Sequence, residues 1–514
     1  MALGWGPGHA KRTQQGRAAD VQSYWLRTAM TPTNILVLMS DEHNPKFLGA
    51  AGHPFIATPN LDALAARGTR FSAAYTACPI CVPARASFAV GRYVHEIGYW
   101  DNADAYEGAI PSWHHALRER GHRVVSIGKL HFRGRKGDDH GFSEEIVPMH
   151  IIDGIGDVKG LIRDRIPTRS GGDKMAKRAG PGESPYTIYD REIASRAQIW
   201  LHDEAPKWRD RPWVLFVSFV APHFPLTAPA RWFYRYFDQD LPLPKRYAQE
   251  ERPHHPFIDD YARTVDYDPH FESPRDVKRA IAGYSGLVSA MDENVGDVLH
   301  ALRAAGLEDS TRVIYTSDHG DNAGARGLWG KSTFYEESAG VPLIVAGPEI
   351  PAGRVVTTPV SHIDCAPTIL EAAGAPAEIG GSALPGASLF AVADGAAPAR
   401  PVISEYHAIS AVAGAFMLRF GKWKYCHYVA YPPQLFNLET DPEELDDLAL
   451  DAQYVDVVRD AERRLRAVLD PEAVDASAKR RQAELLASFG GREAALARGD
   501  LGFTPAPGTA PEMN

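Results

Sequence analysis

The chain has 514 residues, of which 55 are Lys or Arg and 65 are Asp or Glu, so the formal net charge at pH 7 is −10. This acidic balance disfavours a nucleic-acid-binding protein, whose affinity depends on clustered positive charge. Hydrophobic residues make up 44% of the chain and charged residues 23%, which excludes the disordered and fibrous classes. The length suggests about three domains, although we expect one large domain with a smaller appendage.

Residues 1–29 contain basic residues and Gly but lack the apolar centre of a secretory signal. We interpret them as an N-terminal extension outside the fold, with a packed N-terminal arm as the alternative. The longest apolar run near the start, Ile35 to Met39, is far shorter than the about 20 residues that cross a bilayer. We therefore predict no membrane span and a cytoplasmic protein. Four cysteines are too few to form a disulfide framework in a chain of this size.

Three buried strands are predicted over residues 34–39, 213–220 and 312–317, because each segment is continuously apolar. Polar residues follow each strand directly. In open α/β sheets, ligands bind outside the carboxyl ends of the strands. The residues that follow these strands are therefore candidates for a functional site: Asp41, Glu42, His223, Asp318 and His319.

Helical patterns separate these strands, with apolar residues at spacings of three and four between Leu287 and Leu302. Alternating strands and helices favour an α/β fold. Residues 150–275 are rich in Pro, Gly, His and charge, and we interpret them as insertions that cover a site. After residue 398, four short strand-like runs and a helical pattern over residues 451–469 predict a small antiparallel sheet with a helix. The tail from residue 471 is expected to fray.

The most specific local signal is Cys81-Val-Pro-Ala-Arg85. Composition gives a chance expectation of about 0.03 for C-x-P-x-R in this chain. A second signature, G-x-x-x-x-x-x-G-K-x-H, runs from Gly121 through Gly128 and Lys129 to His131. Together these motifs resemble the formylglycine-dependent sulfatases of the alkaline phosphatase superfamily. The resemblance covers about residues 32–450.

Cys78 and Cys81 also form a C-x-x-C pair, which is compatible with a redox or zinc site. No second pair and no nearby His pair completes a zinc site in the sequence. The sulfatase resemblance therefore remains the leading interpretation of Cys81.

The resemblance implies a large, mostly parallel mixed sheet sandwiched by helices, with a smaller C-terminal antiparallel sheet plus helix. The predicted domains are a catalytic domain over residues 30–398 and a small α+β domain over 399–470. We expect residues 471–514 to form a tail at an oligomer contact, in a homodimer or homotetramer.

The resemblance also assigns roles to the catalytic residues. It implies that Cys81 is oxidised to formylglycine, the nucleophile, by a formylglycine-generating enzyme. Arg85 and His131 are expected to hydrogen-bond this group and hold it in place. His223 corresponds to the family histidine that contacts the sulfate or protonates the leaving oxygen.

One divalent cation is expected to bind to oxygen and nitrogen ligands at the strand ends. Its predicted ligands are Asp41, Asp318, His319 and the formylglycine, with Glu42 as a further candidate. Calcium is the family default, and the imidazole of His319 favours manganese as the alternative.

Three further residues are expected to contact the substrate. Lys129 and Lys331 would neutralise sulfate oxygens, and Asn102 resembles the substrate-contacting asparagine of the choline sulfatase and phosphonate monoester hydrolase branches. The stretch Asp139 to Phe142 is expected to border the pocket.

The expected activity is hydrolysis of aryl or small organic sulfate monoesters, which are small anionic esters, through a covalent sulfo-enzyme intermediate. The nearest alternative is a phosphonate monoester hydrolase or phosphodiesterase that uses the same site. A third hypothesis is a catalytically silent binding protein that keeps the fold.

Overall fold

The computed structural model describes residues 30–169 and 172–511, so the expected N-terminal extension lies outside the described residues. Its centre is a sheet in which the strands β9, β1, β7, β4 and β5 are neighbours and parallel. Strand β10 pairs antiparallel with β9 and β2 and makes the sheet mixed. The strands in spatial order are β11 (Arg354–Val356), β2 (Gly68–Phe71), β10 (Leu343–Ala346), β9 (Thr311–Ser317), β1 (Asn34–Asp41), β7 (Val214–Pro222), β4 (Val124–Lys129) and β5 (Glu144–Met149).

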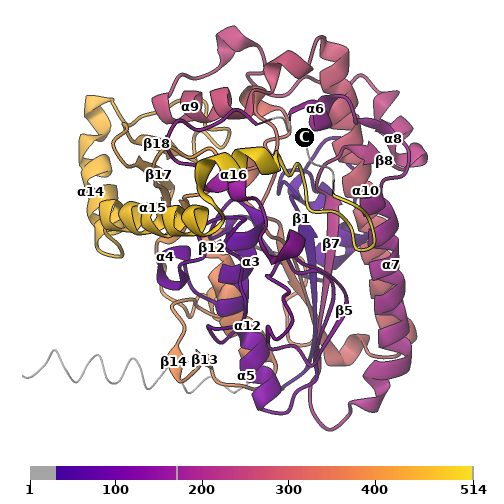
Figure 1. The fold of residues 1–514 in the computed structure, drawn as a ribbon. Coiled ribbons are helices and arrows are strands. Elements are labelled where there is room, and N and C mark those ends of the chain that lie inside the picture. The colour runs from indigo at the N-terminus through magenta and orange to yellow at the C-terminus, as the bar shows by residue number, and fades with distance from the viewer. Residues whose placement is uncertain (1–29, 170–171, 512–514) are drawn as a thin grey trace, which may run out of the picture.

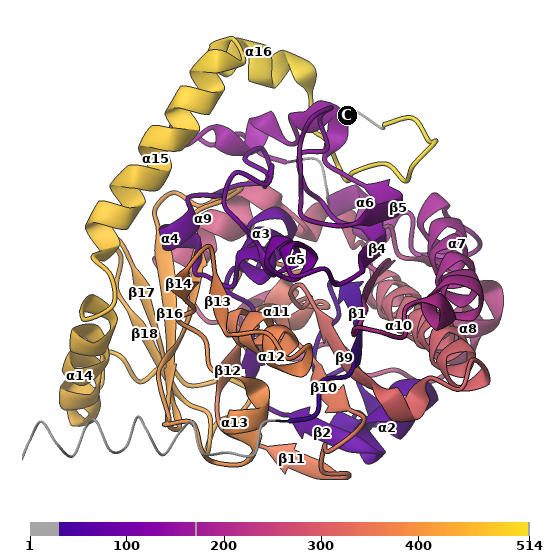
Figure 2. The ribbon, with the colours of Figure 1, turned by 90° about the horizontal axis from the view of Figure 1, so that it is seen from below.

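Helices cover both faces of this sheet (Figures 1 and 2). One face packs against α2 (Pro59–Ala66), α7 (Pro185–Ile199), α8 (Ala230–Phe237) and α10 (Pro274–Ala304). The other packs against α3 (Cys81–Val90), α5 (Trp113–Glu119) and α12 (Cys365–Ala372). This three-layer arrangement confirms the expected α/β sandwich.

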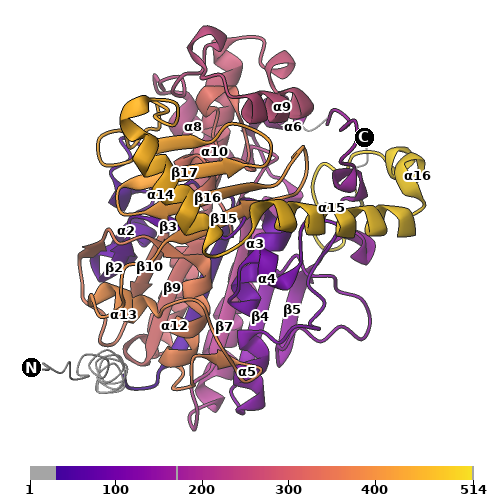
Figure 3. The same cartoon turned by 90° about the vertical axis from the view of Figure 1, so that its left-hand side faces the viewer.

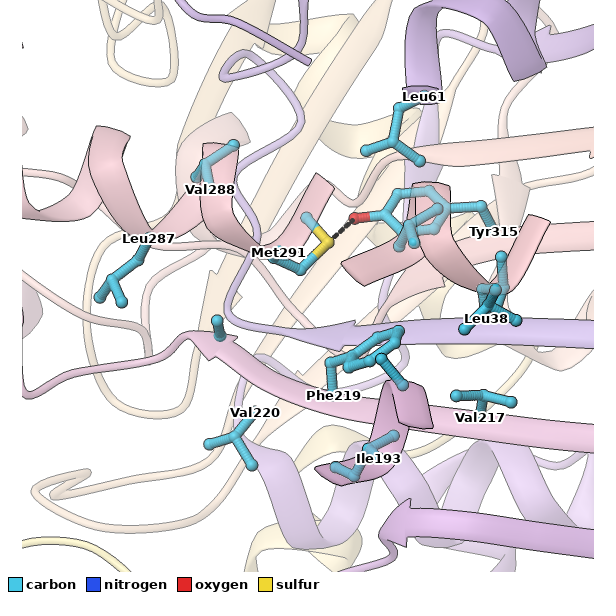
Figure 4. Packing of buried hydrophobic residues seen from close by; sticks show 14 of the residues in the cluster. Leu38, Leu61, Ile193, Val217, Phe219, Val220, Leu287, Val288, Met291 and Tyr315 are labelled. Atoms are coloured by element: carbon cyan, nitrogen blue, oxygen red, sulfur yellow. Dashed lines mark hydrogen bonds between the residues drawn. The ribbon is translucent and has the colours of Figure 1, made fainter. Parts of the chain in front are cut away.

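Strand β1 shows why the sheet needs helices on both sides. Leu36 and Leu38 belong to the apolar cluster under α10, whereas Ile35 and Val37 belong to the cluster on the opposite face. Alternate side chains of a strand point to opposite faces, so a continuously apolar strand requires two covers. Figure 4 shows the α10 side, where the hydroxyl of Tyr315 on β9 contacts the Met291 sulfur at 3.5 Å.

The three predicted buried strands are confirmed as β1, β7 and β9, which lie side by side. The helical pattern between Leu287 and Leu302 belongs to the longer helix α10. The segment expected to consist of insertions is more regular than predicted, since it contains α7, α8 and α9 (Pro256–Val265). Helix α7 begins after Ser184, whose hydroxyl accepts from the Thr187 amide, which is a typical start signal.

A four-stranded antiparallel sheet follows, as expected. Its strands are β15 (Val402–Tyr406), β16 (Ala415–Phe420), β17 (Trp423–Tyr428) and β18 (Gln434–Asn437), and α14 (Val455–Arg466) packs on it. Shorter elements are β3 (Ala74–Tyr75), α4 (Val94–Ile97), α6 (Gly172–Ala176), β6 (Gly180–Pro181), β8 (Thr227–Ala228), α11 (Glu336–Ala339), β12 (Val360–Ser361), β13 (Glu378–Ile379), β14 (Ser382–Ala383) and α13 (Leu389–Ala393).

The segment after residue 471 differs from the expected frayed tail. It forms α15 (Pro471–Ser488) and α16 (Gly491–Arg498), and α15 runs from the small sheet across the catalytic part of the chain (Figure 3). Arg481 pairs with Asp104 at 2.9 Å, and the Gln482 amide donates to the His407 carbonyl. Both contacts hold α15 in place, and the one made by Gln482 is buried. No helix of the described residues is long and apolar enough to span a membrane.

Candidate active site

The carboxyl ends of four neighbouring strands carry the predicted site residues to one place. Asp41 ends β1, Lys129 ends β4, His223 follows β7, and Asp318 and His319 follow β9. All five side chains are buried. Because parallel strands present their carboxyl ends at the same edge, residues far apart in the sequence converge there.

Cys81 lies at the first position of α3, where the helix dipole favours negative charge. Its sulfur is 3.2 Å from Nε2 of His319, 3.3 Å from Nζ of Lys331 and 3.8 Å from Oδ1 of Asp41. Burial raises the pKa of the Cys81 thiol to about 11, and Asp41 adds to this rise. The unmodified thiol is therefore protonated near neutral pH and is a weak nucleophile.

Two buried cations share the carboxylate of Asp41. Nζ of Lys129 lies 2.6 Å from Oδ2 of Asp41, and Arg85 donates to the same oxygen at 3.0 Å. Burial alone would raise the pKa of Asp41, but the neighbouring cations, Lys129 foremost, hold that pKa well below its usual range. Asp41 is therefore a carboxylate and can serve as a cation ligand.

Arg85 also donates to Oδ2 of Asp318 at 2.7 Å and to the Ser218 hydroxyl at 2.9 Å. Its guanidinium thus links the two carboxylates, Asp41 and Asp318, and its expected hydrogen bond to the formylglycine stays a prediction. In this position Arg85 orients the carboxylates that are candidate metal ligands.

Asp41, Cys81, Asp318 and His319 offer ligand atoms that all lie within 4.8 Å of one another. Two carboxylates and one imidazole, all buried, are a donor set that suits a divalent cation. The residues therefore fit the expected metal, and the sulfur marks where the oxygen of a modified side chain would lie.

Glu42 is not a member of this group of four, and its carboxylate contacts Lys331 and His223. Its Oε2 is 3.1 Å from Nζ of Lys331 and 3.4 Å from Nε2 of His223. Its other oxygen, Oε1, has no hydrogen-bond partner among the described residues. Together with Asp41 and His223 it forms a second group of potential ligand atoms.

His223 is held by a hydrogen bond from its own Nδ1 to the Phe224 carbonyl at 2.7 Å. Burial lowers the pKa of His223 well below its usual range, and Lys331 lowers it further. The ring is therefore neutral, and Nε2 faces the site beside Glu42. The turn carrying His223 is fixed by Asp190 on α7, whose carboxylate accepts from the amides of Val220 and Ala221.

His131 and Asn102 complete the predicted set. Nε2 of His131 lies 2.7 Å from the hydroxyl of Thr504, which belongs to the C-terminal part of the chain. Oδ1 of Asn102 accepts from the amide of Val82 in the first turn of α3. Both residues line the same pocket as Cys81.

This pocket has a volume of about 140 Å³ and opens above Cys81. Nine of the predicted site residues belong either to its lining or to the metal-ligand group around Cys81, and its walls are strongly aromatic. The aromatic lining residues are Tyr186, Phe224, Tyr261, Tyr267 and Phe503.

The sequence did not single out several of these residues. Leu501 to Thr504 line the pocket although they lie in the segment expected to fray, and no spacing pattern marks them. The stretch Asp139 to Phe142 does not line the pocket, contrary to our expectation. Asp139 instead pairs with Arg118 at 2.6 Å on the surface. Cys78 is a free, buried thiol and belongs to no group of potential metal ligands among the described residues.

Comparisons with known proteins show which family the chain belongs to. The sulfatase family model matches residues 33–375, and the model for the C-terminal part of N-sulphoglucosamine sulphohydrolase matches residues 324–470. The choline-sulfatase of Rhizobium meliloti (strain 1021) is 35% identical over 466 residues, which cover 88% of this chain and 89% of that protein. Arylsulfatase K of Danio rerio is 30% identical over 471 residues, which cover 87% and 86%.

The fold is shared with the phosphonate monoester hydrolase of Agrobacterium radiobacter, with a TM-score of 0.70 at 23% identity over 85% of this chain and 95% of that one. The family model covers the site residues from Asp41 to Lys331 in one continuous match. Together with the two long sulfatase alignments, this match shows that the chain belongs to the sulfatase family and is a sulfuric ester hydrolase.

Proposed function

We propose that this protein hydrolyses sulfate monoesters of aryl or small organic alcohols, with a formylglycine at position 81 as nucleophile and a covalent sulfo-enzyme intermediate. The observation that supports this proposal most directly is the position of Cys81, whose sulfur lies within 3.8 Å of Asp41, His319 and Lys331 at the base of one pocket. The proposal includes a formylglycine-generating enzyme as the maturation partner and a homodimer or homotetramer as the active form.

Positive charge around the sulfate group is supplied by residues that are already in place. Lys331 faces the sulfur of Cys81 at 3.3 Å. Burial alone would lower the pKa of Lys331, but nearby acidic groups raise that pKa above its usual value, so the amine stays charged. Lys129 and the amino-terminal end of α3 add positive potential at the same place. A fixed positive site stabilises the charge on the equatorial oxygens as the sulfur–oxygen bond breaks.

Proton transfer to the leaving alcohol is assigned to His223. Its Nδ1–H donates to the Phe224 carbonyl, so Nε2 of the neutral ring faces the pocket without a proton. Nε2 therefore has to take up a proton when the anionic ester binds, and it then donates that proton to the leaving oxygen. His131 also lines the pocket and is assigned to the nucleophile. A hydrated aldehyde at position 81 supplies one hydroxyl for attack on sulfur and a second for the elimination that regenerates the aldehyde.

Asp41, Asp318, His319 and the modified residue 81 would hold the divalent cation, with calcium as the first candidate and manganese as the second. When bound, such a cation acts as a Lewis acid and orients the nucleophile. Glu42 is assigned to its two neighbours, the ammonium of Lys331 and the ring of His223, rather than to the metal.

The pocket walls favour a small, compact alcohol group. A volume of about 140 Å³ and five aromatic side chains suit a phenyl ring, and aromatic faces also attract an organic cation. Both 4-nitrophenyl sulfate and choline sulfate are therefore suitable test substrates. Choline sulfate is included because a choline-sulfatase is among the relatives of this chain.

The test compares kcat/KM for 4-nitrophenyl sulfate, choline sulfate and phenylphosphonate monoester, using protein co-produced with a formylglycine-generating enzyme. We expect a sulfate ester to be preferred, and mass spectrometry of the Cys81 peptide to show the aldehyde. The Cys81→Ala variant should lose more than about 1,000-fold in kcat, since removal of a covalent nucleophile costs at least that much. The Cys81→Ser variant should stop after one turnover, because serine has no second hydroxyl on the same carbon.

A clear preference for the phosphonate monoester would favour the alternative hydrolase. An unmodified thiol in fully active protein would contradict the formylglycine chemistry.

A further inference from the structure

The chain returns to the catalytic pocket after α16. After α16, residues 500–504, which we call the C-terminal segment, lie beside Cys81, Lys129 and His131 in the pocket lining. Figure 1 shows the chain beyond α16 passing over the carboxyl-end side of the sheet toward α6. The activity assigned above uses none of these residues.

Ion pairs anchor the start of the segment. The Asp500 carboxylate lies 2.8 Å from Nζ of Lys159 and 3.0 Å from Nε of Arg169, and all three side chains are largely buried. Arg169 also pairs with Asp157, which lines the pocket. A segment held by buried charges has a defined position, because breaking such pairs would leave charges without partners.

Aromatic packing fixes the middle of the segment. The ring of Phe503 meets Tyr186 edge to face at 5.3 Å between centroids and lies 6.4 Å from Phe224. The ammonium of Lys174 lies over the same ring at 5.3 Å. Phe503 therefore forms part of the pocket wall rather than a loose cover.

Thr504 ends the segment at a catalytic side chain. Its hydroxyl lies 2.7 Å from Nε2 of His131, and its carbonyl accepts a hydrogen bond from the Tyr186 hydroxyl. Both residues of this contact are buried, since Thr504 is 9% exposed and His131 is 5% exposed. Water cannot readily replace the threonine at such a buried position.

The other ring nitrogen of His131, Nδ1, is buried and has no hydrogen-bond partner among the described residues. Burial lowers the pKa of His131 well below its usual range, so the ring is neutral and has one donor and one acceptor nitrogen. Because a threonine hydroxyl both donates and accepts, Thr504 can pair with Nε2 in either tautomer. The contact therefore fixes the direction in which Nδ1 points.

From these contacts we infer that the C-terminal segment is a wall of the active site and that Thr504 is a positioning residue that holds His131 toward the nucleophile. This inference rests on the proposed function, because it assigns His131 to the reacting group. It gives residues 500–504 a part in catalysis that no sequence motif indicates.

The test compares Thr504→Val, which keeps the shape and removes the hydroxyl, with Thr504→Ser, which keeps the hydroxyl. Thr509→Val is the matched control, because the Thr509 hydroxyl donates to the nearby Ala506 carbonyl and lies outside the pocket lining. We expect Thr504→Val to lower kcat for 4-nitrophenyl sulfate by about 5- to 20-fold, the effect of one lost hydrogen bond, with KM within about 2-fold. Thr504→Ser should recover most of kcat, and Thr509→Val should match the unaltered protein.

The inference is overturned if Thr504→Val retains kcat within about 2-fold, or if Thr504→Ser is as impaired as Thr504→Val. Hydrogen exchange gives a readout that does not require turnover. The amides of residues 501–504 should exchange more slowly than those of residues 507–511, and still more slowly with inorganic sulfate present. Fast exchange of the amides of residues 501–504 would contradict their assignment to the pocket wall, even if the enzyme is active. An inactive protein in which these amides exchange slowly would contradict only the proposed function.

Discussion

At the scale of single residues, the site is a group of buried opposite charges arranged around Cys81. The carboxylate of Asp41 pairs with both Lys129 and Arg85, and Arg85 also pairs with Asp318. A buried charge is tolerated only where partners compensate for the loss of water. The arrangement therefore keeps two carboxylates ionised and correctly oriented for a cation before substrate arrives.

A bound divalent cation should be required for activity. We expect removal of metal with EDTA to lower kcat for 4-nitrophenyl sulfate by at least about 100-fold, because a Lewis-acid metal contributes several kcal/mol to such reactions. Added Ca²⁺ or Mn²⁺ should restore the rate, and elemental analysis should find one metal per chain.

The His319→Ala variant tests how much the nitrogen ligand contributes to metal binding. It should bind metal more weakly in titrations monitored by elemental analysis, with manganese affected more than calcium, since imidazole favours transition ions. The control is His254→Ala, whose side chain is exposed and distant from the ligand group. Full activity of thoroughly metal-free protein would contradict the assignment.

At the scale of elements, α10 supports the sheet from which the catalytic residues project. This 31-residue helix starts at a capping box formed by Ser273 and Asp276, and its apolar side lies on β7 and β9. Met291 is fully buried in that contact, with its sulfur against the hydroxyl of Tyr315 (Figure 4). The helix therefore contributes stability rather than chemistry.

Shortening Met291 should create a cavity beneath the sheet. We expect Met291→Ala to lower the free energy of unfolding by about 2–5 kcal/mol, as large-to-small core substitutions do. Urea unfolding followed by circular dichroism measures this change. Leu450→Ala is the matched control, because Leu450 is 84% exposed and its truncation should change stability by less than about 0.5 kcal/mol. Equal stability of the two variants would contradict the assignment of Met291 to the core.

At the scale of the whole molecule, the small sheet is joined to the catalytic part by buried ion pairs. Nδ1 of His95 in α4 lies 2.7 Å from Oε1 of Glu405 on β15. Burial alone would raise the pKa of Glu405, but His95 and His407 lower it from 4.5 to about 2. Burial alone would lower the pKa of His95, but Glu405 raises it above its ordinary value of 6.5.

These pKa shifts predict the pH range in which the His95–Glu405 pair stabilises the fold most. The lowered pKa of Glu405 gives stability that is present above pH 4.5 and is lost as the pH falls toward 2. The raised pKa of His95 gives stability that is complete below pH 6.5 and is lost as the pH rises through the folded value. The pair should therefore contribute most between pH 4.5 and 6.5.

The His95→Gln variant keeps a hydrogen-bond donor and removes the charge. We expect its Tm to lie below that of the unaltered protein by about 1–2 °C within this window, and the difference to shrink above about pH 8. Differential scanning calorimetry at several pH values measures the gap. A gap that is constant from about pH 5 to about pH 9 would show that the charge of His95 does not matter.

Much of this protein could be predicted from local patterns in its sequence. The buried strands β1, β7 and β9 follow from continuous apolar runs, and the small sheet follows from short strand-like runs after residue 398. The motifs around Cys81 and Lys129 indicated the family, which the family model and the relatives confirm. The start of helix α7 at the capping residue Ser184 was not predicted, because the surrounding sequence is rich in charged residues.

Contacts between distant segments had no such local signal. The sequence by itself determined which residue types stand at the strand ends and on α3, because strand periodicity and short motifs are local properties. Only the tertiary structure decided that Arg85 binds two carboxylates, that Glu42 turns toward Lys331, and that Thr504 reaches His131 across 373 residues. Such pairings depend on the packing of whole elements, and packing is a property of the complete fold.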